Sequence, residues 1–187
     1  LSFSSGLDLV LSCLPHGLSS RFASKFLEAG TRVIDFSKDF RVGNPGTSYK
    51  AVYGLPELYR ENIRQAPLVA NPGCYATSVI LGLLPLAERG LISAGYVIAD
   101  VISGSSGAGR APVLSGHYPE VNESLSPEPL SARDQEREME LKLSEAAGAK
   151  VNVKFTPHRA PINRGILATI YCDLNEDIDY DAVYNLY

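Results

Sequence analysis

Leu7-Asp8-Leu9-Val10-Leu11-Ser12-Cys13-Leu14 is a nearly continuous apolar stretch that ends at Pro15-His16-Gly17. Strands of parallel sheets have this pattern, because both of their faces are buried. The residues that follow predict a serine-capped helix that ends at Gly30, and then a second strand over residues 32–36. Strand, helix and strand within about 30 residues form a βαβ unit, whose two strands are parallel. The first part of the chain is therefore predicted to be a parallel α/β layer.

The part of the chain after residue 73 has a different pattern. Residues 151–156 alternate between apolar and polar side chains, which is typical of a half-exposed strand. We also expect an apolar helix at residues 75–89, a strand at 96–102, a charged helix at 136–147 and another strand at 165–173. We therefore predict an α/β plus α+β fold, with part of a parallel sheet in residues 1–73 and a mixed-sheet domain in residues 74–187.

Composition excludes several classes of function. The 187 residues, 45% of them hydrophobic, can bury a sizeable core, and the net charge of -4 gives no sign of a nucleic-acid surface. No apolar run approaches the ~20 residues of a transmembrane helix. The three cysteines, Cys13, Cys74 and Cys172, are odd in number, far apart and without metal-ligand spacing. We therefore expect a reducing compartment, no metal, no nucleic-acid partner and no membrane association.

Asn71-Pro72-Gly73-Cys74-Tyr75-Ala76-Thr77 places a cysteine at the start of the predicted apolar helix. A thiol there lies among backbone N–H groups without helical partners and at the positive end of the helix dipole. Both favour the thiolate, which is the form that attacks carbonyl carbon. Cys74 is therefore a candidate nucleophile, and the alternative is a small buried cysteine at a strand–helix junction.

Two glycine-containing turns are candidate anion sites. In Leu14-Pro15-His16-Gly17 the glycine allows close backbone approach, and the next helix offers N–H groups to a phosphate; the alternative is an ordinary tight turn. Ser103-Gly104-Ser105-Ser106-Gly107-Ala108-Gly109-Arg110 follows a predicted strand, and its glycines can present successive N–H donors as an anion nest. Arg110 would add a bidentate guanidinium, and the alternative for this segment is a flexible linker.

A third polar segment, Thr156-Pro157-His158-Arg159-Ala160-Pro161-Ile162-Asn163-Arg164-Gly165, joins two predicted strands. It brings a histidine together with two arginines between prolines that restrict the backbone. It is a candidate binding loop, and the alternative is a polar surface loop. The sequence contains no Gly-x-Ser-x-Gly elbow of a serine hydrolase.

A series of motifs occurs in one order along the chain: Cys13-Leu14-Pro15-His16-Gly17, Val33-Ile34-Asp35-Phe36-Ser37, Asp39-Phe40-Arg41, Val52-Tyr53-Gly54-Leu55-Pro56-Glu57-Leu58, Asn71-Pro72-Gly73-Cys74-Tyr75-Ala76-Thr77, Ser103-Gly104-Ser105-Ser106-Gly107-Ala108-Gly109-Arg110, Glu120-Val121-Asn122-Glu123 and Arg164-Gly165-Ile166-Leu167-Ala168-Thr169. Together they resemble the N-acetyl-gamma-glutamyl-phosphate reductase family, the NADPH-dependent enzymes of arginine biosynthesis. The resemblance covers nearly the whole chain.

The resemblance implies a semialdehyde-dehydrogenase-like subunit that forms a homo-oligomer, a dimer or a tetramer. Residues 1–73 would be the second half of a Rossmann-type NADP-binding domain, and residues 74–187 part of the α+β catalytic and dimerisation domain. The family's catalytic cysteine falls on Cys74. Its thiolate would attack the acyl phosphate, phosphate would leave, and NADPH would reduce the thioester to N-acetyl-glutamate 5-semialdehyde. We expect a cytoplasmic enzyme, or a plastid one if the source is a plant.

The resemblance also suggests the binding residues. The segments that contact the cofactor in the family match His16, Gly17, Ser103, Gly104, Gly107 and Gly109. Asn71, Arg110 and Arg164 are the candidates for binding the phosphate and carboxylate groups of the substrate.

The chain departs from the family pattern in two places. The glycine-rich dinucleotide fingerprint belongs to an earlier βαβ unit, so we expect this chain to be a central piece of a longer protein, with the fingerprint upstream. The family's His-x-His segment, which supplies the general acid and base, corresponds to residues 133–140, where no histidine occurs. His158 is the only local substitute.

Two other functions are compatible with the sequence. One is the sister reaction on an aspartyl or aminoadipyl phosphate, although residues 53–57 and 71–74 favour the glutamyl enzyme. The other is a non-catalytic remnant that acts only as an oligomer partner, which the missing fingerprint and histidines favour.

Overall fold

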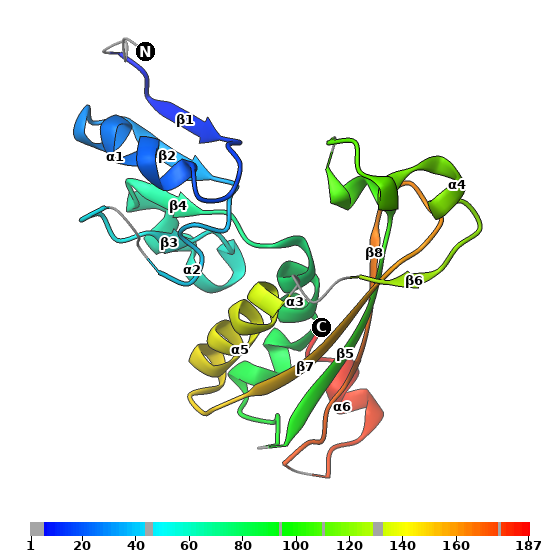
Figure 1. Cartoon of the computed structure of the whole chain (residues 1–187). Helices are drawn as coiled ribbons and strands as arrows, with labels where there is room; N and C mark the ends of the chain where they lie inside the picture. Colours follow the sequence, from blue (N-terminus) through cyan, green and yellow to red (C-terminus); the bar gives the residue numbers. More distant parts are fainter. Residues whose placement is uncertain (1–5, 44–46, 94, 110, 129–132, 176) are drawn as a thin grey trace. The chain divides into compact units, whose positions relative to one another are not determined.

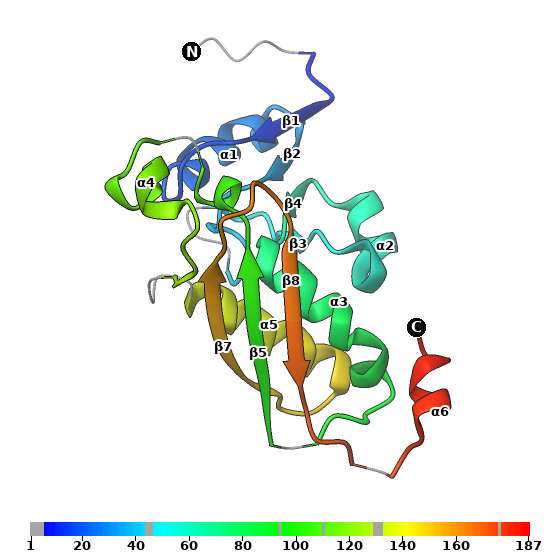
Figure 2. The ribbon, with the colours of Figure 1, turned by 90° about the vertical axis from the view of Figure 1, so that its right-hand side faces the viewer.

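A computed structural model describes residues 6–43, 47–93, 95–109, 111–128, 133–175 and 177–187 (Figures 1 and 2). The chain divides into two compact units, Leu1–Gly73 and Cys74–Tyr187, and each unit is described by itself. Among the described helices, none has the length and apolar character needed to cross a bilayer.

Unit 1 contains a four-stranded parallel sheet in the order β1-β2-β4-β3. Its elements are β1 (Leu9–Ser12), α1 (Ser19–Glu28), β2 (Arg32–Asp35), β3 (Val52–Tyr53), α2 (Pro56–Gln65) and β4 (Leu68–Ala70). The core joins α1 to the central strands, through Ala23, Leu27, Val33, Phe40, Leu68 and Ala70. The predicted βαβ unit and parallel layer are therefore confirmed.

Unit 2 contains a mixed four-stranded sheet in the order β6-β7-β5-β8. β5 (Tyr96–Ser103) and β7 (Asn152–Arg159) are parallel, whereas β8 (Ile166–Tyr171) and β6 (Ser126–Pro127) are antiparallel to their neighbours. Helices α3 (Cys74–Glu88) and α5 (Arg133–Ala147) pack together on one face of this sheet (Figure 2). The predicted mixed α+β arrangement is confirmed.

The pleat of β5 divides the sheet of unit 2 into a covered face and an exposed face. Val97, Ala99 and Val101 are fully buried beneath the helices, whereas Tyr96 and Ile98 point the other way and are exposed. Alternation along the strand thus gives one face to the core and leaves an apolar face uncovered.

Residues 111–128 leave the sheet between β5 and α5 and form an arm (Figure 1). The arm contains a 3-10 turn, η2 (Leu114–Gly116), the one-turn helix α4 (Tyr118–Val121) and β6. A second 3-10 turn, η1 (Ser105–Ala108), follows β5 directly. The last helix, α6 (Tyr180–Tyr184), begins at Asp179, whose side chain accepts a hydrogen bond from the backbone N–H of Ala182 at 2.7 Å.

Helix α5 covers the open edge of β7 with a row of side-chain acceptors. Glu136, Glu140 and Ser144 accept the backbone N–H groups of Phe155, Val153 and Val151 at 3.2, 3.1 and 2.9 Å. Four helical residues rise about 6 Å and two strand residues about 6.6 Å, so acceptors spaced by four match donors spaced by two. The edge donors at residues 151, 153 and 155, where β6 does not pair with β7, are therefore satisfied by side chains of a helix.

Replacing Glu140 with leucine is expected to destabilise the chain. The N–H of Val153, a residue that is 1% exposed, would lose its acceptor at a cost of about 1–3 kcal/mol. Urea unfolding followed by circular dichroism measures this change. Glu140→Gln keeps an acceptor oxygen and serves as the matched control, so equal stability of the two variants would contradict the role given to this bond.

Candidate active site

Cys74 is the first residue of α3, and its side chain is exposed. It borders a cavity of about 570 Å³ within unit 2. The wall comes from the starts of α3 and α5, the end of the arm and the turns beside β5 and β8, through Cys74, Tyr75, Ser103, Gly104, Ser106, Gly107, Ala108, Glu128, Gln135, Gly165 and Ile166. The thiol of Cys74 therefore borders a space that can admit a small-molecule substrate.

The N-terminus of α3 is capped by a residue that lies 60 positions away. Gln135, in the first turn of α5, accepts the backbone N–H groups of Tyr75 and Ala76 through its Oε1 at 3.1 and 3.2 Å. These are the donors that an N-cap side chain takes, and the residue before the helix is Gly73, which has no side chain. Gln135 thus fixes the start of the helix on which Cys74 lies.

Tyr75 anchors the other side of this helix start. Its hydroxyl lies 2.7 Å from the hydroxyl of Ser103, and its ring packs against Phe155 with centroids 5.3 Å apart. Burial raises the pKa of Tyr75, although the hydrogen bond with Ser103 opposes this, and the charge of Glu128 raises the pKa further. Tyr75 is therefore neutral at physiological pH and acts as a fixed hydrogen-bonding group.

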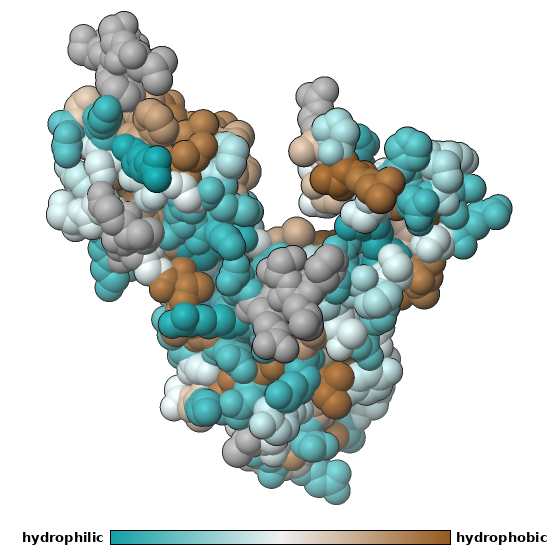
Figure 3. All heavy atoms as spheres, in the orientation of Figure 1, coloured by the Kyte–Doolittle hydropathy of each residue, from teal (hydrophilic) through white to brown (hydrophobic). Residues whose placement is uncertain are grey.

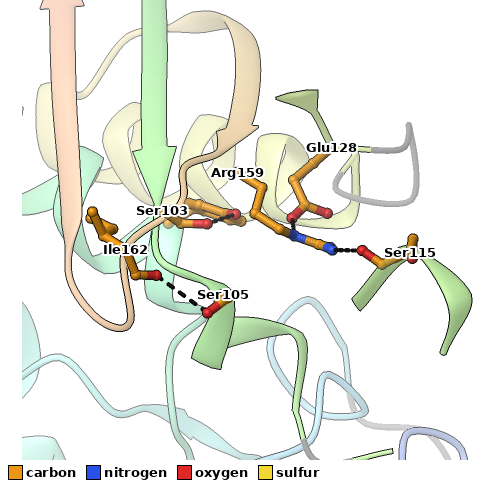
Figure 4. Close-up of polar contacts among 7 residues, drawn as sticks. Ser103, Ser105, Ser115, Glu128, Arg159 and Ile162 are labelled. Carbon is orange, nitrogen blue, oxygen red and sulfur yellow. Dashed lines mark hydrogen bonds and ion pairs between the residues drawn. The ribbon is translucent and has the colours of Figure 1, made fainter. Parts of the chain in front are cut away.

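Arg159 holds both ends of the arm against the sheet (Figure 4). Its Nε donates to Oε1 of Glu128 at 2.7 Å, and its Nη1 donates to the backbone oxygen of Ser115 at 2.9 Å. The two charged side chains are only 13% and 18% exposed. The negative charge of Glu128, a residue of the cavity wall, is thus balanced by Arg159.

The glycine-rich segment after β5 does not form the predicted anion nest. The N–H groups of Gly104, Ser105 and Ser106 donate to backbone oxygens of residues 162–165, and those of Gly107 and Gly109 donate within the turn. A Cβ on Gly104 would lie 2.7–2.8 Å from the backbone of Asn163 and Arg164, so only glycine allows this approach. The neighbouring loop thus accepts the N–H groups of Gly104, Ser105 and Ser106. Cofactor contacts by Ser103, Gly104, Gly107 and Gly109 stay a prediction.

The other predicted residues lie in different places. His158 pairs with Ile102 and Arg159 with Ser103, so the side chain of His158 is on the sheet face away from α3 and does not line the cavity. Arg164 lies in the loop of residues 162–165 that packs against Gly104, and it is exposed. Asn71, in unit 1, donates through Nδ2 to the carbonyl of Pro72. Arg110 lies outside the described residues.

The N-terminus of α1, the predicted phosphate site, is occupied by a carboxylate. Asp39 accepts the N–H of Gly17 at 2.7 Å and the N–H of Ser20 at 3.0 Å, and Nδ1 of His16 accepts the N–H of Lys38 at 3.0 Å. Burial alone would raise the pKa of Asp39, but the hydrogen bonds from Gly17 and Ser20 lower it overall. The N–H of Gly17 therefore already has an acceptor, and cofactor binding by His16 and Gly17 stays a prediction.

Sequence reasoning missed Gln135 and Glu128 as parts of the site, and it named Arg159 only as a member of the candidate binding loop at residues 156–165. No local pattern marks Gln135 or Glu128, and all three residues act through partners at least 31 positions away in the chain. The only signal was that residues 133–140 correspond to the segment in which the family places its acid–base histidines.

Comparison with known proteins identifies the family. A model described as "Semialdehyde dehydrogenase, dimerisation domain" matches residues 74–187, and one described as "Semialdehyde dehydrogenase, NAD binding domain" matches residues 2–66. The chain belongs to the semialdehyde dehydrogenase family. Its residues 2–66 match the NAD-binding domain of this family.

Curated semialdehyde dehydrogenases with related sequences share one name. The chain is 44% identical to N-acetyl-gamma-glutamyl-phosphate reductase of Thermoanaerobacter sp. (strain X514) and 41% identical to that of Clostridium botulinum (strain Alaska E43 / Type E3). Each match covers 96% of this chain and 56% of the relative, so the chain spans about half the length of the curated relatives it matches. The predicted resemblance is confirmed.

Solved semialdehyde dehydrogenases share the fold. Aspartate semialdehyde dehydrogenase II from Vibrio cholerae, complexed with ASA, matches with a TM-score of 0.78 at 19% identity, over 99% of this chain and 61% of that chain. The enzyme from Candida albicans with NADP matches with a TM-score of 0.68 at 16% identity, over 96% and 55%. At these identities the matches establish the fold alone.

Arg159→Met is expected to release the arm of this semialdehyde dehydrogenase. Glu128 would lose a charged hydrogen bond in a largely buried place, at a cost of about 1.5–3 kcal/mol. Proteolytic cleavage within residues 111–128 should accelerate, and thermal unfolding should shift to lower temperature. Arg64→Met is the control, because the Arg64–Glu61 pair is 70% exposed on both sides and should contribute little. Equal effects of the two variants would contradict the proposed anchor.

Asp39→Asn is expected to destabilise the chain in a pH-dependent way. Asparagine can accept only one of the two N–H groups, at a cost of about 1 kcal/mol near pH 7. Since the folded pKa of Asp39 lies below its ordinary value of 3.8, its contribution is present above that value and is lost as pH falls through the folded pKa. Urea midpoints of the two proteins should therefore converge below about pH 4. A difference that persists in acid would refute this assignment.

Proposed function

We propose that this chain forms part of an NADPH-dependent reductase that converts N-acetyl-glutamyl 5-phosphate into N-acetyl-glutamate 5-semialdehyde and phosphate. The observation that carries the proposal is the exposed thiol of Cys74, at the first residue of a capped helix and at the edge of a cavity. The 41–44% identity to curated N-acetyl-gamma-glutamyl-phosphate reductases supports this substrate over related acyl phosphates.

The chemistry begins with acyl transfer to Cys74. The sulfur forms a bond to the carbonyl carbon while the carbonyl π electrons move to oxygen. When the oxyanion collapses, the bond from carbon to the phosphate oxygen breaks and inorganic phosphate leaves, so a thioester remains. NADPH, when bound, supplies the hydride that reduces this thioester.

The cofactor assignment rests on the family. The family model for residues 2–66 supports a nicotinamide dinucleotide, and the resemblance favours NADP. The N-terminus of α1 in unit 1 does not fit a pyrophosphate, because Asp39 already accepts N–H groups there. Our proposed contacts for the cofactor are three residues that line the cavity, Ser103, Gly104 and Gly107. They would contact it by van der Waals packing.

The proposed substrate contact is Arg164. Its side chain is exposed, and its backbone is held against Gly104 at the edge of the cavity, so it can bind a phosphate or carboxylate. Asn71 is a weaker proposal, since its amide donates to Pro72. His158 is not placed to act as the base, because its side chain lies on the opposite sheet face.

We also propose that the protein forms a homo-oligomer through apolar surfaces of this chain. The uncovered sheet face of unit 2 exposes Tyr96, Ile98, Leu167 and Tyr171 by 44–64%. Figure 3 shows further apolar side chains over β1 and the arm. Contiguous apolar patches of this kind mark protein interfaces, and the family model names this region a dimerisation domain. Three free cysteines fit a cytosolic location.

Cys74→Ser is expected to abolish phosphate-dependent reduction of NADP with N-acetyl-glutamate semialdehyde. Loss of the thiolate nucleophile should lower the rate by at least ~10³-fold. The measurement is the absorbance of NADPH. Cys13→Ser is the matched control, because Cys13 is also an exposed free cysteine but belongs to unit 1.

The outcomes separate the alternatives. Activity with aspartate semialdehyde in place of the N-acetyl-glutamyl compound would replace the proposed substrate. An unmodified chain that neither binds NADP nor reduces it would refute catalysis by this chain and leave a non-catalytic partner. Full activity of Cys74→Ser would refute the proposed nucleophile.

A further inference from the structure

We propose that the side-chain amide of Gln135, together with the backbone N–H of Cys74, binds the oxyanion that forms when Cys74 is acylated. The inference rests on the proposed acyl transfer to Cys74. It gives a role to a residue that the sequence alone did not single out.

Two of the backbone donors usually available at a helix N-terminus are already used at the start of α3. The N–H groups of Tyr75 and Ala76 both donate to Oε1 of Gln135. They cannot also bind an oxyanion at full strength. The donors for the reacting carbonyl must therefore come from other groups at the cavity.

The two hydrogen bonds also fix the orientation of the Gln135 amide. Two N–H donors point at one of its two branches, so that branch is the oxygen and the other is Nε2. Nε2 carries two N–H groups, and neither donates a hydrogen bond to any residue that the structure describes. Gln135 also shares the cavity wall with Cys74. The amide is thus held by its oxygen and leaves its donors available at the site.

Other hydrogen-bond donors near the cavity wall are already engaged with protein acceptors. The hydroxyl of Tyr75 is engaged with Ser103, and the guanidinium of Arg159 is engaged with Glu128 and Ser115. The backbone N–H of Cys74, by contrast, donates to no acceptor in the described part of the chain. A backbone donor of the nucleophile paired with a side-chain amide is a known form of oxyanion hole.

The reaction step then balances without another group. Sulfur forms its bond to carbon, the carbonyl π pair becomes the oxyanion, and the two donors bind that oxygen. When the pair returns to carbon, phosphate leaves and the hydrogen bonds weaken again. Gln135 transfers no proton, so it does not replace the family's acid–base histidine.

The test compares two reactions of Cys74 in the whole chain. Acylation by p-nitrophenyl acetate passes through an oxyanion, whereas alkylation by iodoacetamide does not. Both rates are measured on the Cys74 peptide by mass spectrometry, with Cys74→Ser as the blank. Gln135→Glu keeps acceptor oxygens for Tyr75 and Ala76 but loses the amide donors. Gln65→Glu, the same change at an exposed residue of α2, is the control.

We expect Gln135→Glu to lower acylation about 10²- to 10³-fold more than it lowers alkylation. Circular dichroism should show unchanged folding of Gln135→Glu, because the carboxylate keeps an acceptor for the N–H groups of Tyr75 and Ala76. Equal losses in both reactions would assign Gln135 a purely structural role and overturn the inference. A wild-type Cys74 that is alkylated but never acylated would instead refute the proposed acyl transfer itself.

Discussion

The first turn of α5 binds two other elements of unit 2 through adjacent residues. Gln135 accepts N–H groups from the start of α3, and Glu136 accepts the N–H of Phe155 in β7. Successive helical side chains point about 100° apart, so neighbours on one turn can reach a helix and a strand at once. The position of Cys74 relative to the sheet therefore depends on this turn. A shift of α5 would misplace both the helix start and the strand edge.

The polar groups of the cavity wall are mutually satisfied before any substrate binds. Glu128 is balanced by Arg159, and Tyr75 is held neutral in its hydrogen bond with Ser103. An unpaired carboxylate in this wall would repel both a thiolate and an anionic substrate. The ion pair thus removes a charge that would oppose the chemistry of Cys74, in addition to anchoring the arm.

Sequence patterns predicted the elements whose residues carry their own signal. The apolar run at residues 7–14 and the alternation at residues 151–156 predicted strands that the structure contains. β3 was missed, because two residues are too few for a periodic pattern. The anion nest was predicted from glycines among small hydroxyl residues and from Arg110, yet the N–H groups of residues 104–106 donate to a loop some 60 positions later. Local composition shows which conformations are possible, but the partner of each N–H is decided by tertiary packing.

The two helix N-termini that sequence analysis singled out, one for a phosphate and one for the thiol of Cys74, are both capped from a distance, but by groups of different charge. At α1 the cap is the carboxylate of Asp39, which the positive end of the helix dipole stabilises. At α3 the cap is the neutral amide of Gln135, although a carboxylate would accept the same hydrogen bonds. The difference follows from what lies beside each helix. A carboxylate next to Cys74 would raise the energy of a thiolate and of an oxyanion, whereas an amide supplies the same acceptor without charge and retains two donors. In the proposed mechanism, glutamine rather than glutamate at residue 135 therefore fits the negative charge that develops at Cys74.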